Sequence, residues 1–163
     1  MAQSHMPKIT MVFGRVGAGK TTLARRLEAE GAVRLSLDEW TIAASGDNAI
    51  ADWEVVERVL AQLMRFWPQV VAVGGDVVLD LAFWKRSQRD EVRQVACRIE
   101  ADVELLWVRC EDQERRRRCM HRSNPNDGSY MMDEGSFDWI EQNRVIEEPG
   151  SDEEHIIVDT TSG

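Results

Sequence analysis

The feature that most constrains the fold of this chain is the run Gly-Arg-Val-Gly-Ala-Gly-Lys-Thr-Thr at positions 14–22. It matches the spacing Gly-x-x-x-x-Gly-Lys-Ser/Thr at every required position. In such a loop the glycines let the backbone curl with its amide groups inward, and the following helix directs its positive end at the same point. The run therefore predicts a site for the phosphate groups of a nucleotide. The residues expected to surround these phosphates are Gly14, Gly17, Ala18, Gly19, Lys20, Thr21 and Thr22.

The residues on either side of this loop support the prediction. An apolar run at 9–13 precedes it, and apolar residues at helical spacing follow it at 23–27. A strand, a loop and a helix in this order are the setting that the motif requires. Within it, Lys20 is expected to reach the β- and γ-phosphates, and the Thr21 hydroxyl is expected to ligate Mg²⁺. The cofactors predicted from this stretch are a nucleoside triphosphate, ATP or GTP, and Mg²⁺.

The rest of the chain alternates between short apolar segments and segments with helical periodicity, which is typical of an α/β fold with a parallel sheet. Strands are expected at 9–13, 33–37, 77–81, 103–108 and 156–158, and helices at 21–30, 51–67, 87–100, 111–121 and 137–147. Pro68 is expected to end the second helix, and 123–136 is expected to be a surface loop. Residues 1–7 look like an expression-vector scar, which leaves one expected domain at 8–163.

Charge and cysteine content narrow the classes of partner. The formal net charge of −9 argues against a general affinity for nucleic acid, because the phosphates of a polyanion would be repelled. Arginines crowd between positions 109 and 122, and this basic island suits a small anionic ligand better. The 3 cysteines lie far apart and are expected to be reduced thiols of a cytoplasmic protein. No apolar run is long enough to span a bilayer, so no membrane partner is expected.

Two carboxylates follow strands whose carboxyl ends should meet beside the phosphate loop. Asp38 follows the strand expected at 33–37, and Asp80 follows the apolar run Val-Val-Leu. Ligands of open α/β sheets bind at that edge, where a general base and a Mg²⁺ or substrate ligand are needed. We assign Asp38 as the base and Asp80 as the metal or substrate ligand. The alternative is that Asp38 caps a helix beginning at Glu39 and that Asp80 merely closes its strand.

Arginines of the basic island are candidates for offsetting charge on a transferred phosphoryl group. Arg115, Arg118 and Arg122 share one face of the helix expected at 111–121, beside the expected loop. We expect Arg118 and Arg122 to be catalytic and to be carried on a closing lid, the alternative being solvated surface charge. Trp40 and Trp84 follow the two carboxylates and are candidates for either an acceptor pocket or the core.

The chain resembles the P-loop kinase-like ATP-binding proteins of the AAA family (AAA_33 type), which are related to zeta toxins, chloramphenicol phosphotransferase and polynucleotide kinase. The resemblance covers roughly 8–160 and rests on 14–22, 35–40, 77–84 with Arg86 and Arg89, 118–122 and 158–160. It implies a three-layer P-loop NTPase fold with a five-stranded parallel sheet of order 2-3-1-4-5 and helices on both faces. It also implies Asp38 as the base, and it adds Arg89 to the candidate substrate contacts Asp38, Trp40, Asp80 and Trp84. One departure is the segment 145–149, where many relatives carry Phe-Glu-x-Pro.

The activity that these residues and the resemblance favour is ATP-dependent phosphorylation of a hydroxyl group on a small molecule. The acceptor classes expected are a nucleoside, a sugar or an antibiotic-like compound, bound by a monomer or homodimer. Two other functions stay open. One is a polynucleotide 5′-hydroxyl kinase, and the other is a non-catalytic ATP-binding or ATPase switch module.

Overall fold

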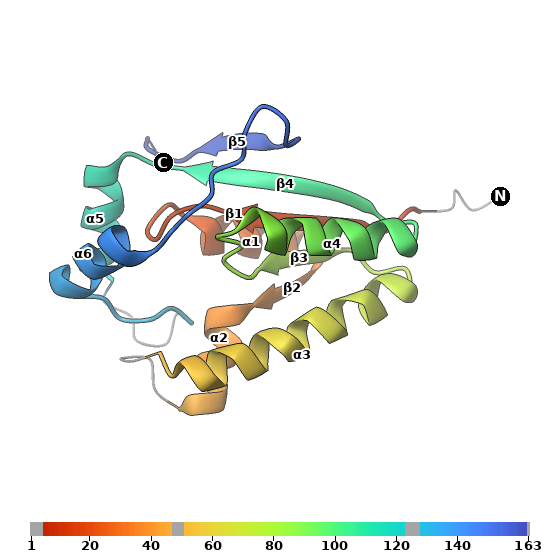
Figure 1. Ribbon diagram of the computed structural model, residues 1–163, viewed down its shortest axis with the longest axis horizontal. Coiled ribbons are helices and arrows are strands. Elements are labelled where there is room, and N and C mark those ends of the chain that lie inside the picture. The colour runs from red at the N-terminus through yellow and green to blue at the C-terminus, as the bar shows by residue number, and fades with distance from the viewer. Residues whose placement is uncertain (1–4, 47–50, 123–127, 163) are drawn as a thin grey trace.

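The computed structural model describes residues 5–46, 51–122 and 128–162. Within these residues, parallel strands form a 5-stranded sheet in the order β2-β3-β1-β4-β5 (Figure 1). The strands are β1 (Lys8–Phe13), β2 (Val33–Ser36), β3 (Val77–Asp80), β4 (Asp102–Arg109) and β5 (Ile156–Asp159). The helices are α1 (Lys20–Ala29), α2 (Leu37–Ser45), α3 (Trp53–Ala72), α4 (Arg86–Arg98), α5 (Asp112–Met120) and α6 (Glu134–Asn143). No helix within the described residues is both long and apolar enough to cross a membrane.

The sheet is the middle of three layers, because the central strand β1 is buried on both faces. Its residues Ile9, Met11 and Phe13 pack in a cluster with side chains of α3 and α4, and α4 crosses in front of the strands in Figure 1. The alternate residue Val12 packs with Leu23 and other side chains of α1 on the opposite face. The α/β class, the parallel sheet and its strand order are confirmed.

The second long helix does not end at Pro68, which corrects the expected limit. Helix α3 continues for another turn to Ala72 with Pro68 inside it. A proline removes one backbone donor from a helix and usually kinks or breaks it. Here the buried stripe of Leu63 and Trp67 continues with Val71, so apolar burial beyond the proline stabilises the last turn.

The segment after β2 is a helix where only weak pattern was visible. Helix α2 begins at Leu37, and its N-cap is Ser36, whose hydroxyl accepts a hydrogen bond from the Glu39 amide at 3.3 Å. Asp38 therefore lies in the first turn of a helix and is not its cap. Gly46, in the left-handed conformation, ends the helix. Residues 47–50, which follow this helix, lie outside the described part of the chain.

Helix α6 begins and ends earlier than expected. Its N-cap is Asp133, whose carboxylate accepts a hydrogen bond from the Ser136 amide at 2.7 Å, so the last part of the expected surface loop is helical. Residues 123–127 of that loop lie outside the described residues. The helix ends at Asn143, and Arg144 already has an extended backbone. Of the expected tag, positions 1–4 are likewise outside the described residues, while the His5 imidazole lies 2.8 Å from Asp76.

Candidate active site

The loop between β1 and α1 has the conformation that its glycines permit. Gly17 and Gly19 have positive φ angles of 77° and 98°, which side chains rarely allow. A Cβ on Gly14 would lie 2.4 Å from the Val108 carbonyl oxygen, so only glycine fits against β4. Gly19 is the N-cap of α1 and has no side chain to accept hydrogen bonds from the first turn. The amides at the start of α1 therefore face the cavity without a capping side chain, as an anion site requires.

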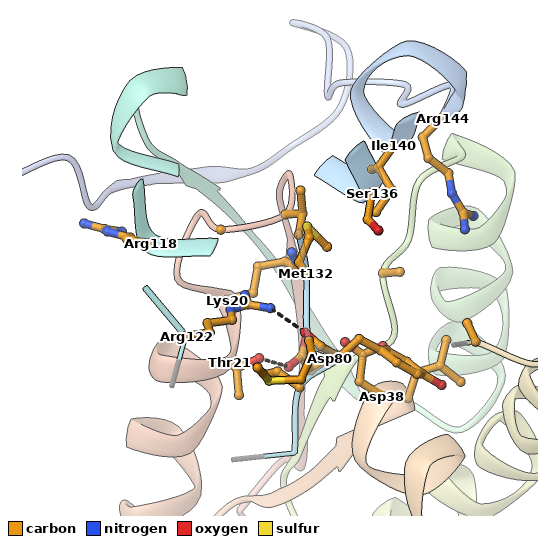
Figure 2. A pocket seen from close by; sticks show the side chains of 18 of the residues that line it. Lys20, Thr21, Asp38, Asp80, Arg118, Arg122, Met132, Ser136, Ile140 and Arg144 are labelled. Atoms are coloured by element: carbon orange, nitrogen blue, oxygen red, sulfur yellow. Dashed lines mark hydrogen bonds between the residues drawn. The ribbon is translucent and has the colours of Figure 1, made fainter. Parts of the chain in front are cut away.

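The side chains of Lys20, Thr21 and Asp80 meet at this helix start (Figure 2). The Lys20 ammonium donates a hydrogen bond to the Arg15 carbonyl at 3.1 Å. The Thr21 hydroxyl donates to the Asp80 carboxylate at 3.2 Å. Asp80 is buried at the carboxyl end of β3, next to β1 in the sheet. A hydroxyl and a carboxylate are hard oxygen donors of the kind that Mg²⁺ prefers, so this pair fits the ion that the family implies.

The described residues contain no cluster of three or more histidine, cysteine or acidic side chains that could hold a metal by itself. The Thr21–Asp80 pair fits a different arrangement, in which Mg²⁺ keeps several waters and takes further ligands from the phosphates that accompany it. Such a site is completed by the nucleotide.

Asp38 lies in the same cavity and carries a perturbed carboxyl group. Its side chain is exposed to the cavity, but the protein crowded around its carboxyl group desolvates it and raises its pKa to about 6, with the nearby Asp80 charge as the second cause. Burial also raises the pKa of Asp80 and lowers the pKa of Lys20. The two carboxylates oppose this lowering of the Lys20 pKa, and Arg122 adds to it. A carboxylate with a pKa near 6 is a stronger base than an ordinary aspartate and is still mostly ionised at neutral pH.

The cavity has a volume of about 940 Å³, at the upper end of the range for small-molecule sites. The phosphate loop lies on one wall, and the other walls include α2, the start of α3, the loop after β3, the end of α5, the segment 129–133 and α6. Of the expected phosphate-site residues, Gly17, Gly19, Lys20, Thr21 and Thr22 line the cavity. Gly14 and Ala18 are buried beneath the loop and support its backbone.

The arginines of α5 and the residues just after it have different neighbours. Arg122 lines the cavity close enough to Lys20 and Asp38 to affect the pKa of both groups. Arg118 also lines the cavity, but its guanidinium donates to Glu114 at 2.9 Å and to the Thr160 hydroxyl at 3.0 Å. Figure 2 shows the Arg118 guanidinium directed away from Lys20. Arg115, on the expected common face, is buried and donates to the Val16 carbonyl at 3.0 Å, so it supports the phosphate loop.

Two of the expected substrate contacts lie elsewhere. Arg89 is fully buried and donates two hydrogen bonds of 2.7 Å to Glu153, so it has no access to a substrate and the expectation drawn from the resemblance is wrong. Trp40 points to the surface, 42% exposed, and packs on Phe66 outside the cavity. Trp84 does line the cavity, as do Asp38 and Asp80.

The main cavity residue that the sequence did not reveal is Arg144. Its guanidinium carbon lies 4.0 Å from the ring centroid of Trp84, 4.2 Å from that of Trp53 and 6.0 Å from that of Trp139. These rings come from the loop after β3, from α3 and from α6. We call Arg144 and its three rings the tryptophan cage. No local signal marks it in one sequence, because its members are brought together only by the tertiary fold.

The sheet order, the glycine loop at the start of α1 and the convergence of Lys20, Thr21 and Asp80 define a P-loop nucleotide-binding protein of the kinase-like class. Residues 9–149 match the family model AAA_33, described as an AAA domain, and the chain belongs to this family. The family implies the use of ATP.

Solved structures of kinases share the fold at low sequence identity. A sugar kinase from Janibacter sp. HTCC2649 matches with a TM-score of 0.64 and 21% identity, over 94% of this chain and 85% of that chain. A gluconokinase from Sinorhizobium meliloti 1021 matches with a TM-score of 0.60 and 19% identity, over 95% and 83%. The APS kinase of Mycobacterium tuberculosis matches with a TM-score of 0.54 and 19% identity, over 69% and 68%. The comparison with curated proteins gives no significant match.

Proposed function

We propose that this protein is an ATP- and Mg²⁺-dependent kinase that transfers the γ-phosphate to a hydroxyl group of a small molecule. The observation that carries the proposal is the position of Asp38. It lies in the same cavity as Lys20 and Asp80, with a pKa raised to about 6. A protein that only binds a nucleotide has no need for a base at this place.

Each residue has one task in this reaction. The amides of the loop and Lys20 bind the β- and γ-phosphates. Mg²⁺ held by Thr21 and Asp80 would neutralise charge on the phosphates. Asp38 accepts the proton of the acceptor hydroxyl while that oxygen bonds to the γ-phosphorus, the bond from this phosphorus to the bridging oxygen breaks, and ADP leaves. Arg122 offsets charge on the transferred group.

A small acceptor is favoured over a nucleic acid. The cavity is bounded by α6 and by the segment 129–133, and the chain carries a net charge of −9. A polyanion would be repelled by that charge. Proteins of the same fold that act as sugar kinase, gluconokinase and APS kinase support the class of small hydroxyl compounds.

The test is ADP release in the presence of ATP and Mg²⁺ against nucleosides, sugars, aldonates, aminoglycosides and 5′-hydroxyl oligonucleotides. We expect a small-molecule acceptor to raise the rate of ADP release.

Lys20→Ala should abolish ATP binding, and Asp38→Asn should keep ATP affinity but lose about 100-fold or more in acceptor-dependent turnover. Asp102→Asn, a surface change at the opposite edge of the sheet, is the matched control. Tight ATP binding without any acceptor-dependent ADP release would instead identify a switch module, and stimulation by oligonucleotides alone would identify a polynucleotide kinase.

A second pair of variants distinguishes the roles of Arg118 and Arg122 in the reaction. Because Arg122 faces the phosphate site, Arg122→Gln should reduce turnover by on the order of 1000-fold, as the loss of an arginine finger does. Arg118 is held by Glu114 and Thr160 beside the loop, so Arg118→Gln should have the smaller effect on turnover. Equal losses of turnover in the two variants would show that Arg118 contributes to the reaction as much as Arg122. A loss below tenfold in Arg122→Gln would remove Arg122 from the reaction.

A further inference from the structure

The tryptophan cage holds a positive charge in the cavity without an acidic partner. Among the described residues, Arg144 forms no ion pair with a carboxylate, and its guanidinium lies against the rings of Trp53, Trp84 and Trp139. Burial is what lowers its pKa, and an arginine still keeps its proton at any physiological pH. Aromatic faces stabilise a cation, but they satisfy its in-plane N–H donors poorly. The cage therefore presents a guanidinium with hydrogen-bonding capacity left for a ligand.

Hydrogen bonds fix the backbone that carries Arg144, while the three rings position its guanidinium. The Arg144 amide donates to the Ile140 carbonyl at 2.9 Å and closes the last turn of α6. Three residues later, the Glu147 amide donates to the Trp84 carbonyl at 2.8 Å, and the Glu147 carboxylate accepts from the Arg86 amide at 2.7 Å. The segment after α6 is thus tied to the loop that carries Trp84. A cation positioned in this way loses little conformational freedom when it binds an anion.

The place of the cage separates it from the nucleotide phosphates. Figure 2 shows Arg144 on the side of the cavity opposite to Arg118 and Arg122, with the Lys20, Thr21 and Asp80 group between them. In the proposed reaction, the loop amides, Lys20 and Arg122 already bind the triphosphate. An anion at Arg144 therefore belongs to the second substrate.

We propose that the acceptor is an anionic hydroxyl compound, whose carboxylate or phosphate group is bound by Arg144 within the tryptophan cage. This inference rests on the proposed kinase function and specifies its substrate class. A guanidinium pairs with either oxyanion through two parallel hydrogen bonds. The apolar part of the acceptor then lies against the indole rings, and its hydroxyl group points toward Asp38.

The test uses acceptors in matched charged and neutral pairs, such as gluconate with sorbitol, glycerate with glycerol, and sugar phosphates with the free sugars. We expect the charged member of a pair to be phosphorylated with the higher kcat/KM. Arg144→Gln should raise KM for this acceptor by about 10- to 100-fold, the range for loss of hydrogen bonds to a charged group, and leave KM for ATP unchanged. Arg144→Lys should recover part of the loss, because it keeps the charge without the paired geometry. Arg98→Gln, at the exposed end of α4, is the control.

A binding measurement distinguishes failure of the inference from failure of the kinase proposal. With ADP and Mg²⁺ present, the same aldonates and sugar phosphates are titrated while tryptophan fluorescence is followed, since three indoles surround Arg144. Saturable binding in the wild-type protein that is lost in Arg144→Gln supports the anion site even if no phosphoryl transfer occurs. The inference is overturned if anions bind equally well to a folded Arg144→Gln protein, if none of them binds, or if neutral acceptors are preferred.

Discussion

At the scale of single residues, the chemistry of the site depends on charged groups that lie close together in one part of the cavity. Burial is the largest influence on Lys20, Asp38 and Asp80, and it favours the neutral form of each. The charges then act on each other, because Asp80 raises the pKa of Asp38 while Lys20 and Arg122 lower it. Both carboxyl groups therefore have raised pKa values, with burial as the first cause of each. For Asp38, the group that we assign as base, these effects together raise the pKa to about 6.

The pKa of Asp38 is open to direct measurement. In the ligand-free protein, carboxyl-labelled aspartate followed by NMR should show one group that titrates near pH 6 and is absent in Asp38→Asn. In Asp80→Asn this midpoint should fall, because a neighbouring negative charge is gone. It should stay above 3.8, because burial is the larger cause and is unchanged. The Asp102→Asn control should leave the midpoint where it is, and a wild-type midpoint near 4 would contradict the base assignment.

At the scale of secondary structure elements, the parts predicted from sequence are those with strong local patterns. The loop at 14–22 and the apolar strands on either side of it were visible, since the glycine spacing and the runs of buried residues are local. Helix α2 entered only as an alternative, with Asp38 as its cap, although Ser36 and Glu39 stand at the spacing of the actual N-terminal cap. The continuation of α3 past Pro68 was missed because the tertiary burial of Val71 outweighs a local helix breaker.

The residues that sequence reasoning placed wrongly or missed all depend on contacts between distant positions. Arg89 meets Glu153, which lies 64 positions away, and a single sequence shows no sign of that pairing. Arg144 meets Trp53 of α3 and Trp84 of the loop after β3, which are both far from it in the sequence. Asp38 and Asp80 could be placed at one edge of the sheet because parallel strands end there together.

The cap of α2 gives a test at this scale, because it orients the turn that carries Asp38. Ser36→Ala removes the acceptor for the Glu39 amide and should cost about 1 kcal/mol of unfolding free energy. That loss corresponds to a fall in Tm of about 2–4 °C for a chain of this size. Ser87→Ala, an exposed change in the first turn of α4, should stay within about 0.5 kcal/mol. Thermal unfolding of both variants measures the contribution of the cap. Equal Tm values for Ser36→Ala and Ser87→Ala would show that the cap does not stabilise the fold.

At the scale of the whole molecule, a buried ion cluster joins the C-terminal part of the chain to the site. Glu153, just before β5, pairs with Arg89 of α4 at 2.7 Å and with Arg93 at 2.8 Å. Arg89 also donates to the Phe83 carbonyl at 3.0 Å. Phe83 and its neighbour Ala82 have positive φ angles of 45° and 72°, a conformation that costs on the order of 1–3 kcal/mol per residue. The cluster therefore stabilises the strained turn between Asp80 and Trp84, although none of its members touches the cavity.

Glu153 should dominate the acid sensitivity of this arrangement. Burial opposes its ionisation, but the hydrogen bonds from Arg89 and Arg93 outweigh it and hold the pKa at about 2, below the ordinary value of 4.5. A carboxyl group whose pKa is lowered by folding stabilises the folded state above its unfolded pKa and loses this contribution as the pH falls through its folded pKa. Unfolding free energy should therefore decrease between about pH 5 and pH 2. Urea unfolding across this range measures the decrease, and Glu153→Gln should flatten it.

The same variant separates stability from site geometry. Glu153→Gln leaves the Arg89 charge buried without its partner, which should cost about 3–5 kcal/mol. Asp152→Asn, which weakens an exposed pair with Arg86, should cost no more than about 1 kcal/mol.

The double change Arg89→Met with Glu153→Leu removes both charges and should recover most of the stability, because apolar groups can replace a buried pair. It also removes the bond to the Phe83 carbonyl, so acceptor KM should rise while ATP affinity is kept. Wild-type acceptor KM in this stable double variant would mean that the turn carrying Trp84 holds its strained shape without the cluster.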